Sequence, residues 1–159
     1  MLNVCRLLSV LYLLFSITFL FCASISWFVG DVLWIVFLKS FACVFIFGGL
    51  LLLLTFRRDK ALSLHEGFVL VVGTWTTLSF MASLPFIFFG LPILDSIFEG
   101  VSGLTTTGAE VFTGLDAWPT TLLFYHQFLE WLGGLGIIIL AISIMPLLGV
   151  GGMQLYRLE

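Results

Sequence analysis

Charged residues are scarce in this chain. Asp, Glu, Lys and Arg make up only 9% of the 159 residues, compared with roughly 25% in soluble domains. This scarcity excludes a large soluble domain, and the 61% of hydrophobic residues indicates a membrane protein whose apolar segments contact lipid. Basic residues are fewer than acidic ones, six against nine, which gives a formal net charge of −3. That balance argues against a nucleic-acid partner.

Cysteine is also sparse and shows no ligand spacing. Cys5, Cys22 and Cys43 lie in apolar surroundings and none belongs to a Cys-x-x-Cys pair, so neither a disulfide framework nor a metal knuckle is predicted. The two histidines, His65 and His126, are far apart in the sequence, and no nucleophile, base and orienting group are clustered. We therefore expect a protein that is not an enzyme and that binds no organic cofactor.

Long apolar runs predict an all-α membrane protein, because a helix needs about 20 apolar residues to cross the hydrocarbon core. Arg6 and the apolar residues 7–23 loosely resemble an export signal, but the run exceeds the roughly 7 to 15 residues of a signal core and favours a retained helix. We expect a transmembrane helix pair in residues 1–60 and a helix, re-entrant helix, filter loop and helix in residues 61–159. The four expected crossings are residues 7–29, 32–56, 67–90 and 120–148.

Between the last two crossings, residues 94–104 predict a helix of half the membrane thickness. Such a helix would rise roughly 16 Å, about half of the ~30 Å hydrocarbon core. The next residues are Thr105, Thr106, Thr107 and Gly108, whose carbonyls could point inward together because glycine tolerates unusual backbone angles. Rings of backbone carbonyls replace the hydration shell of potassium in channels. The segment therefore predicts a selectivity filter that binds potassium at Thr105 and Thr106.

A plainer interpretation of the same residues is a helix end that Gly108 caps, with the threonines bonding back onto the helix. An irregular turn that faces lipid would leave backbone amides unsatisfied at a cost of several kcal/mol each. A turn at membrane depth must therefore be buried in protein or line water. This constraint, together with the half-length helix, favours the filter.

The distribution of charge predicts the orientation, because Lys and Arg in short loops stay on the cytoplasmic side. The residues that place the N-terminus in the cytoplasm are Arg6, Arg57, Arg58, Lys60 and Arg157. Glu110 and Asp116 are then predicted at the outer mouth, where negative charge concentrates cations. Asp31, Asp95 and Glu99 fall on the same face, and Lys39 is expected to snorkel to the outer interface.

Three motifs in residues 60–159 resemble the Trk/Ktr family of bacterial potassium uptake proteins, and the Trk-type membrane subunit most closely. The first two crossings resemble the additional N-terminal helix pair of the Trk branch, although any apolar hairpin would fit. The motifs, in order, are SGLTTTGA at 102–109, WLGGLG at 131–136 and PLLGVGGMQL at 146–155.

The resemblance implies potassium uptake in the bacterial inner membrane through a pathway of four covalently linked units, each giving one filter strand. This chain would carry only the first unit. We therefore expect a fragment, a truncated reading frame or one piece of a split protein, completed by the remaining units or by other copies of the subunit. By the same resemblance, a soluble nucleotide-binding regulatory subunit would dock on the cytoplasmic face.

Some residues depart from the family pattern or have two interpretations. Glu110 follows the motif where a small residue is expected, His126 stands where arginine is common, and Glu130 where glutamine is common, so charge pairing between that helix and the loop does not carry over directly. Glu99 is interpreted as a structural support of the half-length helix. The glycines at 133, 134 and 136 favour close helix approach over a hinge.

Two rival functions remain. The half-length helix could belong to a secondary carrier with a broken helix at the bilayer midplane, which predicts an inverted copy of the motif that this sequence does not contain. Alternatively, the chain is a nonconducting remnant, because one quarter of a pore conducts nothing unless it assembles with other copies.

Overall fold

The computed structural model describes residues 2–55, 63–111 and 118–144, and every secondary-structure element in these ranges is an α-helix. The predicted all-α class is confirmed. The helices are α1 (Leu2–Val29), α2 (Trp34–Leu54), α3 (Leu64–Ala82), α4 (Leu84–Phe89), α5 (Ile93–Leu104) and α6 (Thr120–Ile144).

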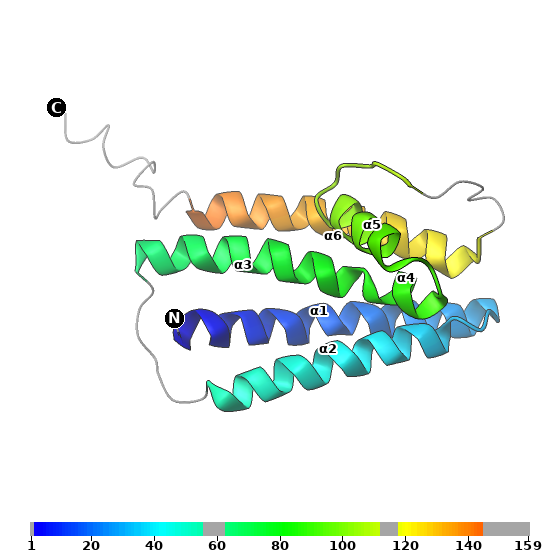
Figure 1. Ribbon diagram of the computed structural model, residues 1–159, viewed down its shortest axis with the longest axis horizontal. Coiled ribbons are helices and arrows are strands. Elements are labelled where there is room, and N and C mark those ends of the chain that lie inside the picture. Colours follow the sequence, from blue (N-terminus) through cyan, green and yellow to red (C-terminus); the bar gives the residue numbers. More distant parts are fainter. Residues whose placement is uncertain (1, 56–62, 112–117, 145–159) are drawn as a thin grey trace.

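Four stretches are long and apolar enough to cross a membrane, in the predicted order. Figure 1 shows α1 and α2 as an antiparallel pair, with α3 and α6 beside it running in opposite directions. Residues 145–148, which we placed in the fourth crossing, and the basic residues at 57, 58, 60 and 157 lie outside the described residues. The candidate crossings are Leu2–Val29, Trp34–Leu54, His65–Phe89 and Thr120–Leu140.

The third crossing is interrupted, because α3 ends at Ala82 and α4 begins at Leu84. Pro85 explains the interruption, since its ring has no N–H to donate and clashes with the carbonyl four residues earlier. Gly90 then ends α4 with φ +106°, a left-handed cap for which glycine has no steric cost. The chain can therefore leave the bundle end sharply and enter α5.

Tyr125 of α6 lies at the centre of the core and is fully buried. The centroid of its ring lies 5.4 Å from those of Phe37 and Phe86 and 6.1 Å from that of Phe19. Its hydroxyl donates a 2.7 Å hydrogen bond to the carbonyl of Ala82. One side chain thus joins α6 to α1, α2 and the junction between α3 and α4.

The turn between α1 and α2 is held by Asp31. Its carboxylate accepts hydrogen bonds from the hydroxyls of Ser26 and Thr121 and from the backbone N–H of Leu33. Partial burial acts to raise the pKa of Asp31, but these hydrogen bonds outweigh it and keep the pKa below its usual value. Because Thr121 belongs to α6, the same carboxylate also ties this turn to the last helix.

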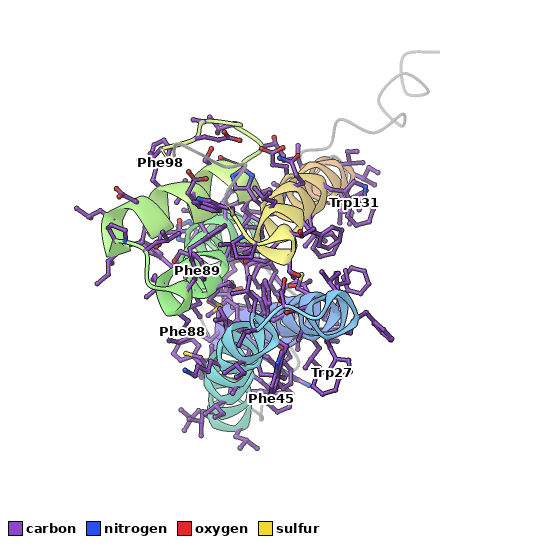
Figure 2. All side chains as sticks on the ribbon, turned by 90° about the vertical axis from the view of Figure 1, so that its right-hand side faces the viewer. Trp27, Phe45, Phe88, Phe89, Phe98 and Trp131 are labelled. Atoms are coloured by element: carbon purple, nitrogen blue, oxygen red, sulfur yellow. The ribbon has the colours of Figure 1, made fainter. Side chains whose placement is uncertain are left out.

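The outer surface of the bundle is apolar. Figure 2 shows large rings around the periphery, among them Trp27, Phe45 and Trp131, which are 66%, 49% and 59% exposed. A monomeric soluble protein rarely exposes such contiguous apolar area. The surface is suited to lipid or to further protein, as the membrane class requires.

Candidate ion-binding site

α5 is too short to cross a bilayer. Its 12 residues rise about 18 Å, roughly half of the hydrocarbon thickness, and they cover the predicted residues 94–104. Figure 1 shows α5 leading inward from the bundle end at which α4 ends and α6 begins, with the chain after Leu104 turning back toward that end. The segment is a helix in its own right, separated from α4 by residues 90–92.

Two glycines allow α5 to pack tightly between α3 and α6. A Cβ placed on Gly100 would lie 2.8 Å from both the carbonyl oxygen of Ser79 and the backbone nitrogen of Ser83. A Cβ placed on Gly103 would lie 3.2 Å from the Cβ of Leu129 in α6. The small residues of α5 therefore fix its distance from both neighbouring helices.

α5 ends in a Schellman motif whose left-handed residue is a threonine. The amide of Thr106 donates to the carbonyl of Gly103 at 3.0 Å, and the amide of Thr107 donates to that of Ser102 at 2.9 Å. Thr106 has φ +56°, an unusual angle for a β-branched residue. The plainer interpretation, in which Gly108 caps this helix, is wrong about the capping residue, because Thr106 holds that position.

One part of that interpretation is present in the structure. The hydroxyl of Thr105 donates to the carbonyl of Val101 at 2.7 Å and lies 2.8 Å from the hydroxyl of Thr107. Gly108 also has a left-handed backbone, with φ +65°. Two left-handed residues, Thr106 and Gly108, therefore shape the turn.

We call residues 105–111 the Thr/Gly strand. The residues from Thr105 to Gly108 are exposed, and the amides of Thr105, Thr106 and Thr107 donate to carbonyls of α5. Within the described ranges, no hydrogen bond is accepted by the carbonyl oxygen of any residue from Thr105 to Gly108. The strand therefore turns amides toward its own helix and leaves four consecutive carbonyls available to a ligand.

Ser102 holds the strand just beyond Gly108. Its hydroxyl donates to the carbonyl of Ala109 at 2.7 Å and accepts from the amide of the same residue at 2.9 Å. Ser102 is 4% exposed. The sequence motif contains this serine, but only the folded turn shows that it faces a residue seven positions later.

Glu99 holds the strand at Val111. One carboxylate oxygen, Oε1, accepts from the amide of Val111 at 2.9 Å, and the other, Oε2, lies 2.8 Å from Nε2 of His126. Glu99 and His126 are 1% and 6% exposed. Sequence reasoning named Glu99 as a support but missed its partner on α6, because His126 is distant in the chain and differs from the family's usual arginine.

A stripe of α6 at helical spacing lies behind the strand. His126 contacts Glu99, and Oε1 of Glu130 lies 3.8 Å from where a Cβ of Gly108 would be. A Cβ on Gly133 would lie 2.0 Å from the carbonyl oxygen of Leu104, which excludes any side chain there without movement of the backbone. Close helix approach, predicted for this glycine cluster, is confirmed at Gly133, whereas Gly134 has open space around it.

Acidic residues lie near the end of the bundle from which α5 leads inward and toward which the strand returns. Asp31 lies in the turn after α1, Asp95 in the first turn of α5, and the exposed Glu110 near the end of the Thr/Gly strand. Asp116, the other predicted residue of the outer mouth, lies outside the described residues. Lys39 is exposed near the start of α2, and its snorkelling to the outer interface stays a prediction.

Comparison with known proteins places these features in a family. The model of the TrkH family, described as a cation transport protein, matches residues 34–159. The Trk system potassium uptake protein TrkH of Vibrio parahaemolyticus is 42% identical over 160 aligned residues, which cover 99% of this chain and 33% of the relative. The corresponding TrkH of Salmonella typhimurium is 44% identical, over 97% of this chain and 32% of the relative.

A solved structure has the same fold. The crystal structure of the potassium transporter TrkH from Vibrio parahaemolyticus matches with a TM-score of 0.89 and 39% identity, over 95% of this chain and 33% of that one. The chain thus spans about a third of the length of these relatives. With the family model matching most of its length and the solved relative sharing its helix arrangement, this multi-pass membrane chain belongs to the TrkH family of cation transport proteins.

Proposed function

We propose that this chain supplies one strand of the selectivity filter of a potassium uptake system and catalyses no chemical reaction. The observation that carries the proposal is the set of unclaimed carbonyls from Thr105 to Gly108 on a strand whose flanking residues are held by buried side chains. The names of its relatives, which are potassium uptake proteins, support potassium as the ion.

The chemistry follows from the orientation of the strand. Carbonyl oxygens of Thr105, Thr106, Thr107 and Gly108 would replace part of the hydration shell of a potassium ion. The C-terminus of α5 carries roughly half a negative charge, and it ends directly before these residues. Selection therefore rests on fixed backbone dipoles and needs no titratable ligand.

One strand cannot surround an ion, so the proposal includes the rest of the pathway. The remaining pore units of a longer chain, or other copies of this one, would contribute the other carbonyls. Glu110 and Asp116 would raise the local cation concentration at the outer entrance, an effect that salt screens over roughly 8 to 10 Å.

The proposed orientation places the N-terminus in the cytoplasm of a bacterial cell, with the protein in the inner membrane. Arg6 begins the first crossing at the end opposite to the Thr/Gly strand, which agrees with basic residues remaining inside. A cytoplasmic regulatory subunit that binds nucleotide would then meet the basic residues at 57, 58, 60 and 157.

A substitution at Gly108 tests the filter. We would replace the matching third of the Vibrio parahaemolyticus relative with residues 1–159 and measure rubidium and sodium uptake in cells that lack their own potassium uptake. Because Gly108 has φ +65°, Gly108→Ser strains the strand, and we expect the preference for rubidium to fall roughly tenfold. Gly134→Ala is the matched control, since nothing lies within 4 Å of its Cβ position. An unchanged preference in Gly108→Ser would contradict the proposal.

Expression of residues 1–159 alone separates assembly from fragmentation. Growth of the same cells at low potassium would show that copies of this chain complete a pathway together. Absence of growth, with the chimera active, would show that the additional units are required.

A further inference from the structure

We propose that His126 and Ser102 are positioning residues of the filter, acting on two separate points of the Thr/Gly strand. The inference rests on the proposed function, and it assigns to a helix outside the strand a part in ion selection. His126 acts on Val111 through Glu99, whereas Ser102 acts directly on Ala109.

The first argument is the placement of the held residues. The Schellman bonds fix the amides of Thr106 and Thr107 before Gly108, and the two side-chain contacts fix Ala109 and Val111 after it. The residues from Thr105 to Gly108, whose carbonyls would bind the ion, are therefore anchored on both sides. With only the helix end holding it, the strand after Gly108 would be free to turn its carbonyls away from an ion.

The second argument is that both carboxylate oxygens of Glu99 already have a hydrogen-bond partner. Each of its carboxylate oxygens has one strong partner, Val111 N–H for Oε1 and His126 Nε2 for Oε2, and the side chain is almost completely buried. A buried carboxylate that loses a partner is strongly destabilised and moves toward another donor. Removal of the His126 imidazole therefore weakens the hydrogen bond between Glu99 and the amide of Val111. His126 acts on the strand only through Glu99.

The third argument is that α6 carries these contacts on a single face. His126 is followed at helical spacing by Glu130, near Gly108, and by Gly133, against Leu104 and the methyl group of Thr106. A shift of α6 would reach the strand at all three levels. His126 is the member of this stripe that forms a hydrogen bond to a residue holding the strand.

Amide hydrogen exchange of the 159-residue chain, measured by NMR in detergent micelles, separates the two contacts. His126→Leu should accelerate exchange at Val111 roughly tenfold or more and leave Ala109 protected. Ser102→Ala should accelerate exchange at Ala109 and leave Val111 protected. His126→Gln should behave as wild type, because its amide nitrogen can donate from nearly the same place as Nε2. Gln127→Leu, an exposed neighbour on α6, is the matched control and should change neither amide.

Ion selection is the second readout. In the chimera described above, His126→Leu should lower the rubidium-over-sodium preference several-fold, and His126→Gln should restore it. Unchanged exchange at Val111, or equal acceleration at Val111, Ala109, Thr106 and Thr107, would overturn the inference. It would also be overturned if His126→Leu accelerated exchange at Val111 but left the rubidium-over-sodium preference unchanged, while Gly108→Ser lowered that preference. If Gly108→Ser also left selectivity unchanged, the proposed function itself would fail.

Discussion

Two turns at the same end of the bundle, the α1–α2 turn and the Thr/Gly strand, are both stabilised by an acidic side chain. In the α1–α2 turn, the left-handed residue is Gly30, with φ +79°, and the carbonyl of Ser26 accepts the amides of Gly30 and Asp31. In the Thr/Gly strand, the left-handed capping residue is Thr106, and within the described ranges the carbonyls from Thr105 to Gly108 accept no hydrogen bond.

The difference sets a connecting turn apart from the strand that we propose binds an ion. Glycine adopts the left-handed conformation freely, whereas the same conformation costs about 1 to 2 kcal/mol for a residue with a Cβ. Such strain persists where surrounding contacts enforce it, and it is concentrated at functional sites. Ser102, Glu99 and Gly133 provide those contacts around the strand, whereas Gly30 adopts its left-handed angle without this strain.

The largest expected effect comes from Gly133, which holds the strained turn against α6. Gly133→Ala places a Cβ 2.0 Å from the Leu104 carbonyl oxygen, so α5 and α6 must separate, at a cost of about 1 to 3 kcal/mol or more. Thermal unfolding in detergent measures it. Gly134→Ala should instead be neutral or stabilising, because alanine favours the helix by about 0.5 to 1 kcal/mol. Equal effects of the two substitutions would contradict the close approach.

Exchanging the left-handed residues tests the comparison directly. Gly30→Thr should destabilise the chain by about 1 to 2 kcal/mol, because a β-branched residue must adopt φ +79°. Thr106→Gly should leave the free energy of unfolding unchanged or raise it by up to about 1 kcal/mol, since relief of strain offsets the greater entropy of glycine when unfolded. Chemical denaturation measures both. A large loss of stability in Thr106→Gly would show that Thr106 is not strained.

Asp31 predicts a dependence on pH for the α1–α2 turn. Its pKa is lowered in the folded state, so its contribution is fully present above the usual carboxylate pKa and disappears as the pH falls through the folded value. Asp31→Asn should lower stability by about 1 kcal/mol at neutral pH and reduce the loss of stability on acidification. Melting temperatures between neutral and acidic pH provide the measurement, and parallel curves for the two proteins would refute the role of this carboxylate.

The smallest effect is expected at the exposed Glu110. Glu110→Gln should leave thermal stability unchanged and lower the initial uptake rate about twofold at low ionic strength, because it removes a charge that attracts cations. At high salt the difference should vanish through screening. A difference that persists at high salt would place Glu110 in direct contact with the ion.

The sequence was sufficient for the parts of the fold that depend on local pattern. Apolar run lengths predicted the crossings, and the half-length segment was placed within one residue of α5, because Pro92 and the threonines bound it on either side. The division at residues 60 and 61 stays a prediction, since it falls outside the described residues.

The contacts that hold the Thr/Gly strand in place could not be predicted, because they join residues that are distant in the sequence. Ser102 meets Ala109 only after Thr106 adopts a left-handed angle, which the β-branched type disfavours. His126 meets Glu99 only when α6 packs against α5. The plainer interpretation placed the helix cap at Gly108 because glycine is the usual residue in that position.

The central claim is that the carbonyls of Thr105, Thr106, Thr107 and Gly108 bind the transported ion. A crystal structure of the chimera with thallium in place of potassium, using anomalous diffraction, tests it directly. The account predicts thallium peaks in direct contact with these backbone oxygens. Thallium bound at carboxylates of the outer mouth, with none along the Thr/Gly strand, would contradict it.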